Sequence, residues 1–222
     1  VTGADPVFIV VNQGDGSYYS EATQKNHFLE RELLHPLCKG SLNIRRYNID
    51  TITKSIIFPY RIVEGKAILL TPKELAEKYP NIWEYFKSNK ARLEARENGK
   101  WKHKNWYAFG RNQNLTEMNQ EKILTPSIGK GACFTFDSED FFYFMGSGGG
   151  GGGGYGITLK KDVGMSYLYV LGLLNSRLST FYLKRISSAF RGGYIALNRQ
   201  YIEKLPIRTI DFSDPAAVAR HD

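Results

Sequence analysis

The chain has 222 residues, 42% of them hydrophobic and 14% aromatic, which is enough to build a buried core and excludes a disordered chain outside one glycine-rich stretch. Its 30 basic and 22 acidic residues give a net charge of +8, which favours a polyanionic partner. Two cysteines are too few for a disulfide framework, and no signal peptide or apolar run of membrane-spanning length is visible, so we expect a cytoplasmic protein without a membrane partner.

The first seventy residues predict a region of strands with one helix. Strands are expected at three apolar runs, residues 7–11, 55–60 and 66–70. The Glu64-Gly65 pair between the last two runs suits a tight hairpin turn. Apolar spacing also predicts a helix over residues 21–34, which ends before Pro36.

Two helices are predicted between residues 71 and 97. Thr71, Pro72 and Glu74 are typical of a helix start, because threonine caps the first turn, proline suits the first helical position and glutamate can complete a capping box. Pro80 should break this helix and open a second one, which is amphipathic and basic and ends near Glu97.

The second half of the chain predicts more strands and a long helix. Strands are expected at residues 122–129, 132–137, 141–144, 157–159 and 205–210. A helix is expected over 166–184 and a short one over 199–204. The apolar side of the long helix would carry Leu168, Leu171, Leu174, Leu178 and Phe181. Because strands and helices do not alternate regularly, we expect an α+β fold, with a mixed, mainly antiparallel sheet and several packed helices.

Glycine fills almost every position from residue 146 to residue 156. A phosphate-binding P-loop is excluded, because no lysine and hydroxyl residue follow the glycines to open a helix. If residues 141–144 and 157–159 are neighbouring strands, the run is the loop between them, and its bare backbone suits a close approach to DNA or to another domain. An unstructured loop or an engineered replacement for a longer insertion fits the composition equally well.

The sequence offers little support for a metal site. The four histidines lack zinc-ligand spacing, and there is no Cys-x-x-Cys pair. Asp50, Glu64 and Lys66 have a spacing that a metal-dependent nuclease could use, with two carboxylates on the metal and a lysine that helps to activate water. The turn expected at Glu64-Gly65 favours a solvated turn instead.

A dense group of aromatic and basic residues lies between residues 100 and 114. Arginine can pair with guanine, and asparagine or glutamine with adenine, so Arg111, Asn112 and Gln113 make a credible base-reading loop beside Trp106 and Tyr107. The alternative is that the two aromatic residues belong to the core and that Arg111 caps an element. Cations that could neutralise phosphates, or be ordinary surface charges, are Lys54, Arg61, Lys130, Arg185 and Arg191.

Several segments in fixed order resemble a known family. They are VTGADPVFIV, SIIFPY, WYAFGRNQN, EKILTPSIG, FFYFMGSGGGGGGGYGI, YVLGLLNSRLSTFYLKR and GGYIALNRQYIEKLPI. The series covers most of the chain and resembles the target-recognition region of TaqI-type adenine DNA methyltransferases and of related enzymes that fuse nuclease, methylase and specificity domains. The order LLNS, GGY and LPI after a W-Y-x-x-G-R segment is its most specific part.

The resemblance implies a specificity domain without the chemical half of the enzyme. Phe58-Pro59-Tyr60 lacks the second proline and the polar residue of the Asn/Asp-Pro-Pro-Tyr/Phe motif that grips a flipped adenine. We therefore expect no cofactor in this chain, S-adenosylmethionine in a catalytic domain elsewhere, and magnesium only if a nuclease is fused to it. The expected partners are double-stranded DNA and that catalytic domain.

In domain terms, the resemblance implies one target-recognition domain, residues 1–222, cut from a longer protein. A subdivision into 1–99 and 100–212 is possible, and residues 213–222 look like the start of a following helix. Within this picture Arg111 and Asn112 read base edges, Lys130 and Arg191 hold phosphates, and Ser187 and Ser188 bond to either. The full set of expected DNA-contacting residues is Trp106, Tyr107, Arg111, Asn112, Gln113, Lys130, Ser187, Ser188, Arg191 and Tyr194. The alternatives are a nuclease piece of the same system, or an RNA-binding or protein-interaction domain.

Overall fold

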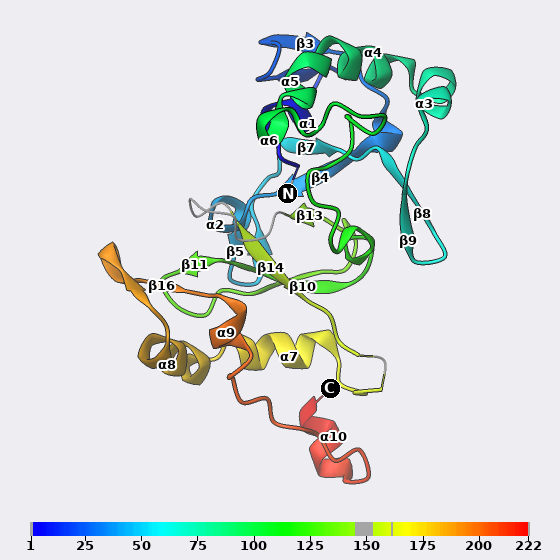
Figure 1. The fold of residues 1–222 in the computed structure, drawn as a ribbon. Coiled ribbons are helices and arrows are strands. Elements are labelled where there is room, and N and C mark those ends of the chain that lie inside the picture. The colour runs from blue at the N-terminus through cyan, green and yellow to red at the C-terminus, as the bar shows by residue number, and fades with distance from the viewer. Residues whose placement is uncertain (1, 145–152, 161, 222) are drawn as a thin grey trace. The chain divides into compact units, whose positions relative to one another are not determined.

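The computed structural model describes residues 2–144, 153–160 and 162–221 and has an α+β fold with mostly antiparallel strands, as predicted (Figure 1). The chain folds into two compact units that are interleaved along the sequence. Unit 1 comprises Val1–Leu37 and Ile52–Asn119, and unit 2 comprises Cys38–Thr51 and Gln120–Asp222. The chain therefore leaves unit 1, contributes a short segment to unit 2, and returns.

Unit 1 is built on an antiparallel sheet in which strands follow the order β4-β7-β1-β2-β3. The bounds of these strands are β1 Ile9–Asn12, β2 Tyr18–Ser20, β3 Lys25–His27, β4 Leu34–Cys38 and β7 Lys54–Ile57. A separate hairpin joins β8, Tyr60–Val63, to β9, Lys66–Leu69. Its turn residues Glu64 and Gly65 both have positive φ, so the predicted tight turn is confirmed.

The helices of unit 1 lie mainly between residues 72 and 99. Thr71 caps the first of them and forms the predicted capping box with Glu74. The second predicted helix, residues 81–97, is instead broken at Asn89 and Ala95 into three pieces. The helical segments are α1 Asp5–Phe8, η1 Arg31–Leu33, α3 Pro72–Lys78, α4 Pro80–Ser88, α5 Lys90–Glu94, α6 Arg96–Gly99 and η2 Leu115–Glu117.

Of the predictions for the N-terminal region, one strand starts later than expected and one helix is absent from the described residues. The strand predicted from residue 7 begins only at Ile9, because Pro6 lies in the first turn of α1. The helix predicted over 21–34 does not form, and the segment contributes β3 and η1. The carboxylate of Glu30 accepts hydrogen bonds from the backbone N–H groups of Asn81 and Ile82, at 2.8 and 2.9 Å, and so caps α4. Pairing with distant residues thus outweighs the local helical spacing.

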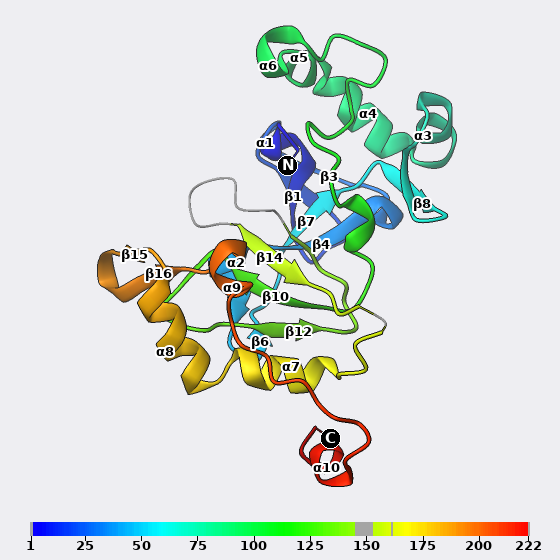
Figure 2. The same ribbon diagram turned by 60° about the horizontal axis from the view of Figure 1, so that its bottom comes forward.

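Unit 2 contains two small antiparallel sheets and a hairpin. The sheet β12-β10-β14 is covered on one face by α7, and a second sheet has the order β11-β16-β15 (Figure 2). Between the sheet and the helices lies an apolar core that includes Phe134, Leu171 and Leu197. The strands are β5 Ile44–Arg45, β6 Asn48–Ile49, β10 Lys122–Pro126, β11 Ile128–Gly129, β12 Thr135–Asp137, β13 Tyr143–Phe144, β14 Gly154–Ile157, β15 Ala189–Phe190 and β16 Tyr194–Ala196.

The single helix predicted over 166–184 is two helices. Ser166 caps α7 and Ser176 caps α8, and the chain turns between them at Asn175. The predicted apolar side is not buried as a whole: on α7, Leu171 and Leu174 are buried and Leu168 is exposed, and on α8, Leu178 and Phe181 are exposed. The helical segments of unit 2 are α2 Gly40–Asn43, α7 Tyr167–Leu174, α8 Arg177–Ile186, η3 Arg191–Gly193, α9 Arg199–Ile202 and α10 Pro215–His221.

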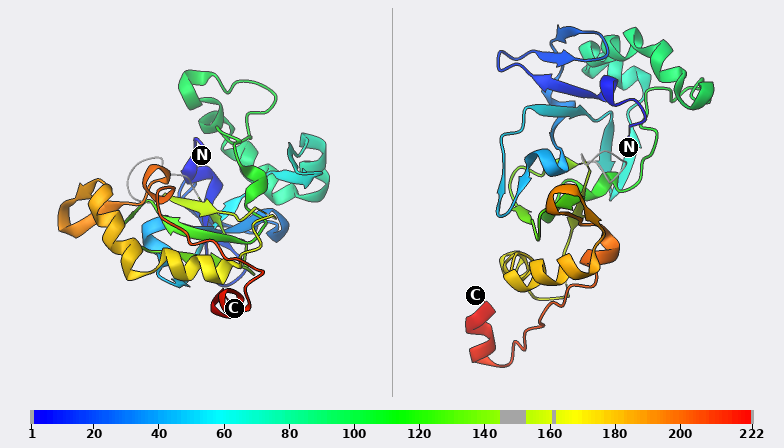
Figure 3. Two further views of the ribbon diagram at one scale, coloured as in Figure 1. Left: turned by 90° about the horizontal axis from the view of Figure 1, so that it is seen from below. Right: turned by 90° about the vertical axis from the view of Figure 1, so that its left-hand side faces the viewer.

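Two further strand predictions in unit 2 need correction. Residues 205–210 were expected to be a strand, but they form an extended segment without ladder pairing, which leads to α10 (Figure 3). The expected neighbours at 141–144 and 157–159 are not paired in one sheet, because β14 pairs with β10 and β13 belongs to another sheet. The glycines at 146–152, whose role as a close-approach loop was predicted, lie outside the described residues.

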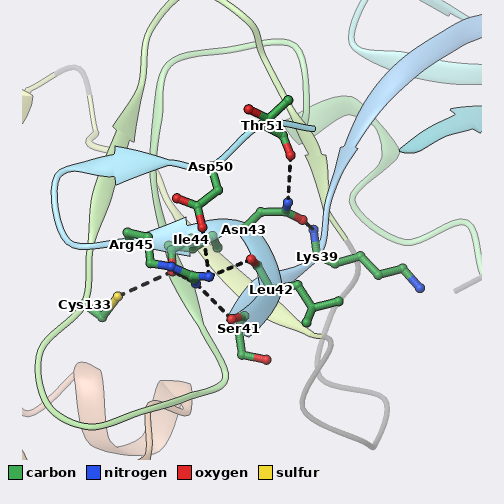
Figure 4. Close-up of polar contacts among 9 residues, drawn as sticks. All are labelled: Lys39, Ser41, Leu42, Asn43, Ile44, Arg45, Asp50, Thr51 and Cys133. Carbon is green, nitrogen blue, oxygen red and sulfur yellow. Dashed lines mark hydrogen bonds and ion pairs between the residues drawn. The ribbon is translucent and has the colours of Figure 1, made fainter. Parts of the chain in front are cut away.

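The segment that unit 2 takes from the first half of the chain is stabilised by its own polar contacts (Figure 4). The guanidinium of Arg45 donates to the backbone oxygens of Ser41, Leu42 and Ile44 and pairs with Asp50 at 2.9 Å. The side chain of Asn43 accepts from the Lys39 backbone N–H, also within the segment. These contacts satisfy the carbonyls at the end of the four-residue helix α2, which is too short to be stable alone.

Candidate nucleic-acid interface

The aromatic half of the segment 106–114 is part of the core of unit 1. Trp106 is 7% exposed and lies against Trp83, with ring centroids 5.6 Å apart. Tyr107 is 1% exposed, and its hydroxyl donates to the carbonyl of Leu70 at 2.7 Å. Both were predicted to contact DNA, but their burial gives them a packing role, and we leave them out of the interface. This agrees with the alternative interpretation of the two aromatic residues.

The next residues tie the segment to the rest of unit 1. The backbone N–H of Phe109 donates to the hydroxyl of Tyr60 at 2.8 Å, and burial raises the pKa of that tyrosine to about 12. The backbone N–H of Gly110 donates to the carbonyl of Thr2, also at 2.8 Å. A Cβ at Gly110 would lie 3.2 Å from that same oxygen, so the close contact favours glycine.

A short polar loop follows at once, and we call residues Arg111, Asn112, Gln113 and Asn114 the reading loop. All four are exposed, and Asn114 adopts the left-handed conformation, with φ +57°. Leu115 is buried directly after the loop and begins η2. Within the described residues, Arg111 takes part in none of the ion pairs, so its guanidinium is available to a ligand. The reading loop therefore presents amide and guanidinium groups between Phe109 and Leu115, which are both buried.

A second group of predicted contact residues lies in unit 2, on the hairpin β15–β16 and beside it. Phe190 and Tyr194 face each other across the two strands and are 49% and 39% exposed. The Lys130 ammonium lies 5.3 Å from the centre of the Tyr194 ring, and Arg191 is exposed at the turn. We call the exposed residues Lys130, Ser188, Phe190, Arg191 and Tyr194 the hairpin patch. In Figures 1 and 2 the hairpin lies next to α8.

The two serines before the hairpin differ in accessibility. The hydroxyl of Ser188 is 2.7 Å from the hydroxyl of Tyr201, and this hydrogen bond lowers the pKa of Tyr201. The Ser187 hydroxyl is buried and has no hydrogen-bond partner among the described residues. Ser188 is therefore placed to contact a ligand, whereas Ser187 is not.

Arg185, another candidate for phosphate contact, lies on α8. Its guanidinium is 4.3 Å from the centre of the exposed Phe181 ring.

The other two candidates for phosphate contact, Arg61 and Lys54, are less available to a ligand. Arg61 pairs with Glu74, and Lys54 is half-buried in β7. Arg96, one of the basic residues in the segment predicted to be an amphipathic helix, is 7% exposed and donates to four backbone carbonyls. Nothing in its local sequence distinguishes it from its exposed neighbour Arg92.

The residues of the nuclease pattern are divided between the two units. Asp50 is in unit 2 and pairs with Arg45, while Glu64 and Lys66 are in unit 1, with Glu64 at the hairpin turn. No group of three or more histidine, cysteine, aspartate or glutamate side chains that could hold a metal occurs in the described part of the chain. None of the described helices is long and apolar enough to cross a membrane.

Comparison with known proteins adds two findings. The sequence model of the TaqI-like C-terminal specificity domain matches residues 35–207. The chain is also 24% identical over 221 residues to the type II restriction enzyme and methyltransferase RM.Eco57I of Escherichia coli. That alignment covers 96% of this chain and 22% of the relative, so the chain spans about a fifth of the relative's length.

Proposed function

Since the chain belongs to the TaqI-like C-terminal specificity domain family, we propose that it recognises a specific sequence in double-stranded DNA. The observation that carries the proposal is the reading loop, four exposed polar residues between the tightly packed Gly110 and the buried Leu115. An exposed side chain on a rigid support can meet a base edge without a large loss of conformational entropy.

The chemistry of the loop suits the major groove. The guanidinium of Arg111 can donate two parallel hydrogen bonds to O6 and N7 of guanine, and the amides of Asn112 and Gln113 can donate to and accept from adenine. In the hairpin patch, Lys130 and Arg191 would neutralise phosphates, and Ser188 would donate to a phosphate oxygen. The exposed rings of Phe190 and Tyr194 offer flat surfaces for sugars or unstacked bases.

The proposed partner is a catalytic domain outside these 222 residues. RM.Eco57I is by name both a restriction enzyme and a methyltransferase, and this chain corresponds to about a fifth of it. We propose that residues 1–222 act as one recognition module for an adenine-specific methyltransferase, which would bind S-adenosylmethionine. A fused nuclease would bind magnesium. In that arrangement the module holds the duplex while the catalytic domain rotates the target adenine outward.

The decisive experiment is retention of a randomised duplex pool by the chain at low and moderate salt, with sequencing of the bound fraction. An enriched motif that survives the higher salt is expected for a base-reading domain. Retention that is lost with salt and enriches no motif would reduce the function to phosphate binding. A preference for single-stranded RNA, or no retention at all, would contradict the proposal.

Within that assay, Arg111→Ala is expected to lower discrimination at one base pair by about 1–3 kcal/mol, the contribution of one bidentate arginine–guanine pair. The measurement is the ratio of affinities for the enriched duplex and for duplexes changed at single positions. Arg92→Ala, which removes an exposed arginine of α5, is the matched control. Unchanged discrimination in Arg111→Ala would remove Arg111 from the interface.

A further inference from the structure

Arg96 is a buried cation held by backbone carbonyls. Its Nε donates to the carbonyl of Leu93 at 2.8 Å, and its Nη1 donates to the carbonyls of Thr2 and Ala108, both at 2.9 Å. Its Nη2 donates to the carbonyl of Trp106. The guanidinium also lies over the Trp101 ring, with Cζ 4.0 Å from its centre. Burial lowers the pKa of Arg96 from its ordinary value, but an arginine in a protein stays charged.

The four carbonyls belong to three different segments of unit 1. Leu93 is on α5, Thr2 is at the start of the chain, and Trp106 and Ala108 lie directly before the reading loop. Arginine is suited to this task because its planar guanidinium carries five donors in fixed directions, whereas a lysine ammonium is a single point with three. A buried cation that lost these bonds would be strongly destabilised, so the network holds the three segments in one arrangement.

The network reaches the reading loop through Gly110. The carbonyl of Thr2 accepts from both Arg96 and the Gly110 backbone N–H. Gly110 is also packed against Gly3, since a Cβ on Gly110 would lie 3.4 Å from the Gly3 Cα. Thus the residue directly before Arg111 is positioned by the same oxygen that Arg96 holds.

We infer that Arg96 is a positioning residue for base reading, which fixes Gly110 through the carbonyl of Thr2 and so sets the place from which Arg111 projects. The inference rests on the proposed function of the reading loop. Arg96 itself is buried and does not touch DNA; it acts by limiting the loop to the one geometry that matches the base edge. Recognition of this kind tolerates errors of only about 0.5 Å.

The first test needs no DNA. Amide hydrogen exchange is measured in the 222-residue chain for Arg96→Lys and for Arg92→Lys, a matched exposed position on the neighbouring helix α5. Lysine cannot span the four carbonyls, so the Gly110 amide should exchange about tenfold faster or more in Arg96→Lys and at the wild-type rate in Arg92→Lys. Unchanged protection of Gly110 in Arg96→Lys would overturn the inference.

The second test separates positioning from a general loss of stability. Arg111→Ala should lower discrimination between the enriched duplex and its single-position variants by about fivefold to 150-fold. Arg96→Lys should lower discrimination at the same base pair by about fivefold or more, and the double variant should match Arg111→Ala within about twofold. A merely structural role would instead lower affinity for every duplex alike.

If Arg96→Lys does not fold, a second variant that changes the position of the reading loop directly can test the inference. Gly110→Ala keeps Arg96 but displaces the loop from Thr2, and it should reduce the same discrimination. If the losses of discrimination in Arg96→Lys and Arg111→Ala multiply in the double variant, Arg96 does not act through the reading loop and the positioning role is overturned. Wild-type discrimination in Gly110→Ala would also overturn it. If Arg111→Ala itself left discrimination unchanged, base reading by the loop would be refuted, and the inference with it, whatever the exchange rates showed.

Discussion

Asn175 shows how a single residue of the recognised LLNS segment shapes unit 2. Its side-chain oxygen accepts from the backbone N–H of Phe134 at 3.0 Å, and its side-chain nitrogen donates to the carbonyl of Phe134 at 2.8 Å. The amide thus makes the two hydrogen bonds that a neighbouring strand would make. Arg46 donates to the carbonyl of Asn175, which also lies at the turn between α7 and α8. A motif residue that could be read as a DNA contact is therefore structural.

The variant Asn175→Ala is expected to lower the free energy of unfolding by about 1–3 kcal/mol, since it leaves the buried N–H of Phe134 unpaired. The carbonyl of Phe134 loses one of two hydrogen bonds and keeps the one from the Tyr47 backbone N–H. Urea denaturation measures the loss. Asn48→Ala, at an exposed asparagine of the β5–β6 hairpin, should change stability by less than about 0.5 kcal/mol. If both variants lost the same free energy of unfolding, the hydrogen bonds between Asn175 and Phe134 would contribute no more to stability than an exposed asparagine does.

At the scale of elements, the start of α3 is the clearest case in which local chemistry decides the structure. Thr71 accepts from the Glu74 backbone N–H, and Glu74 accepts from the Thr71 backbone N–H at 2.8 Å, while Pro72 occupies the first turn. The hydrogen bonds from Thr71, with a smaller contribution from Arg61, lower the pKa of Glu74 from 4.5 to about 2. Apart from the contact with Arg61, all of these contacts join residues of the four-residue segment 71–74.

Removal of the cap should therefore have a pH-dependent effect. Thr71→Ala is expected to cost about 1 kcal/mol at neutral pH. Because the pKa of Glu74 is lower in the folded chain, its stabilising contribution is complete above pH 4.5 and is lost as the pH falls towards 2. Thermal unfolding at pH 7 and pH 3 should show a smaller difference between wild type and Thr71→Ala at the lower pH. Lys73→Ala, in the same turn, is the control, and a difference that does not shrink would contradict the explanation.

Other elements depended on distant partners. Apolar residues in the segment 21–34 have helical spacing, but the carboxylate of Glu30 accepts a hydrogen bond at the start of α4, and β3 pairs with β2. The apolar spacing over 166–184 continues across Asn175, although the chain turns there because Ser176 begins a new helix. In both segments the spacing of apolar residues shows which side chains favour burial, but it does not show where the backbone turns.

At the scale of the whole molecule, the net charge of +8 and the family membership point to a phosphate-rich ligand. Lys130→Ala and Arg191→Ala are each expected to weaken binding to all duplexes alike. Each should reduce the slope of log K against log salt by about 1, because each would remove one of the proposed phosphate contacts. Filter binding at several salt concentrations measures this, with Lys73→Ala as control. A change in sequence preference without a change in slope would assign these residues to base reading instead.

Much of the molecule could be predicted from the sequence: the α+β class, the Glu64-Gly65 hairpin, the capped start of α3, the short helix after Asn198 and the family itself. The candidate site was predicted only in part. Arg111, Asn112 and Gln113 were chosen for their chemistry and are exposed, and so are Lys130, Arg191 and Tyr194. Trp106 and Tyr107 were chosen by the same reasoning and are buried, because an aromatic side chain suits a core as well as a ligand.

By itself, then, the sequence determined what depends on residues close together in the chain: caps, turns, strand-forming runs, net charge and the order of motifs that marks the family. Only the tertiary structure decided which side chains are accessible and which are enclosed. Arg96 and Arg92 lie four residues apart on neighbouring short helices, yet one is buried among carbonyls from three segments and the other is exposed. The physical reason is that burial depends on groups brought from far away, such as the Thr2 carbonyl that Arg96 and Gly110 share.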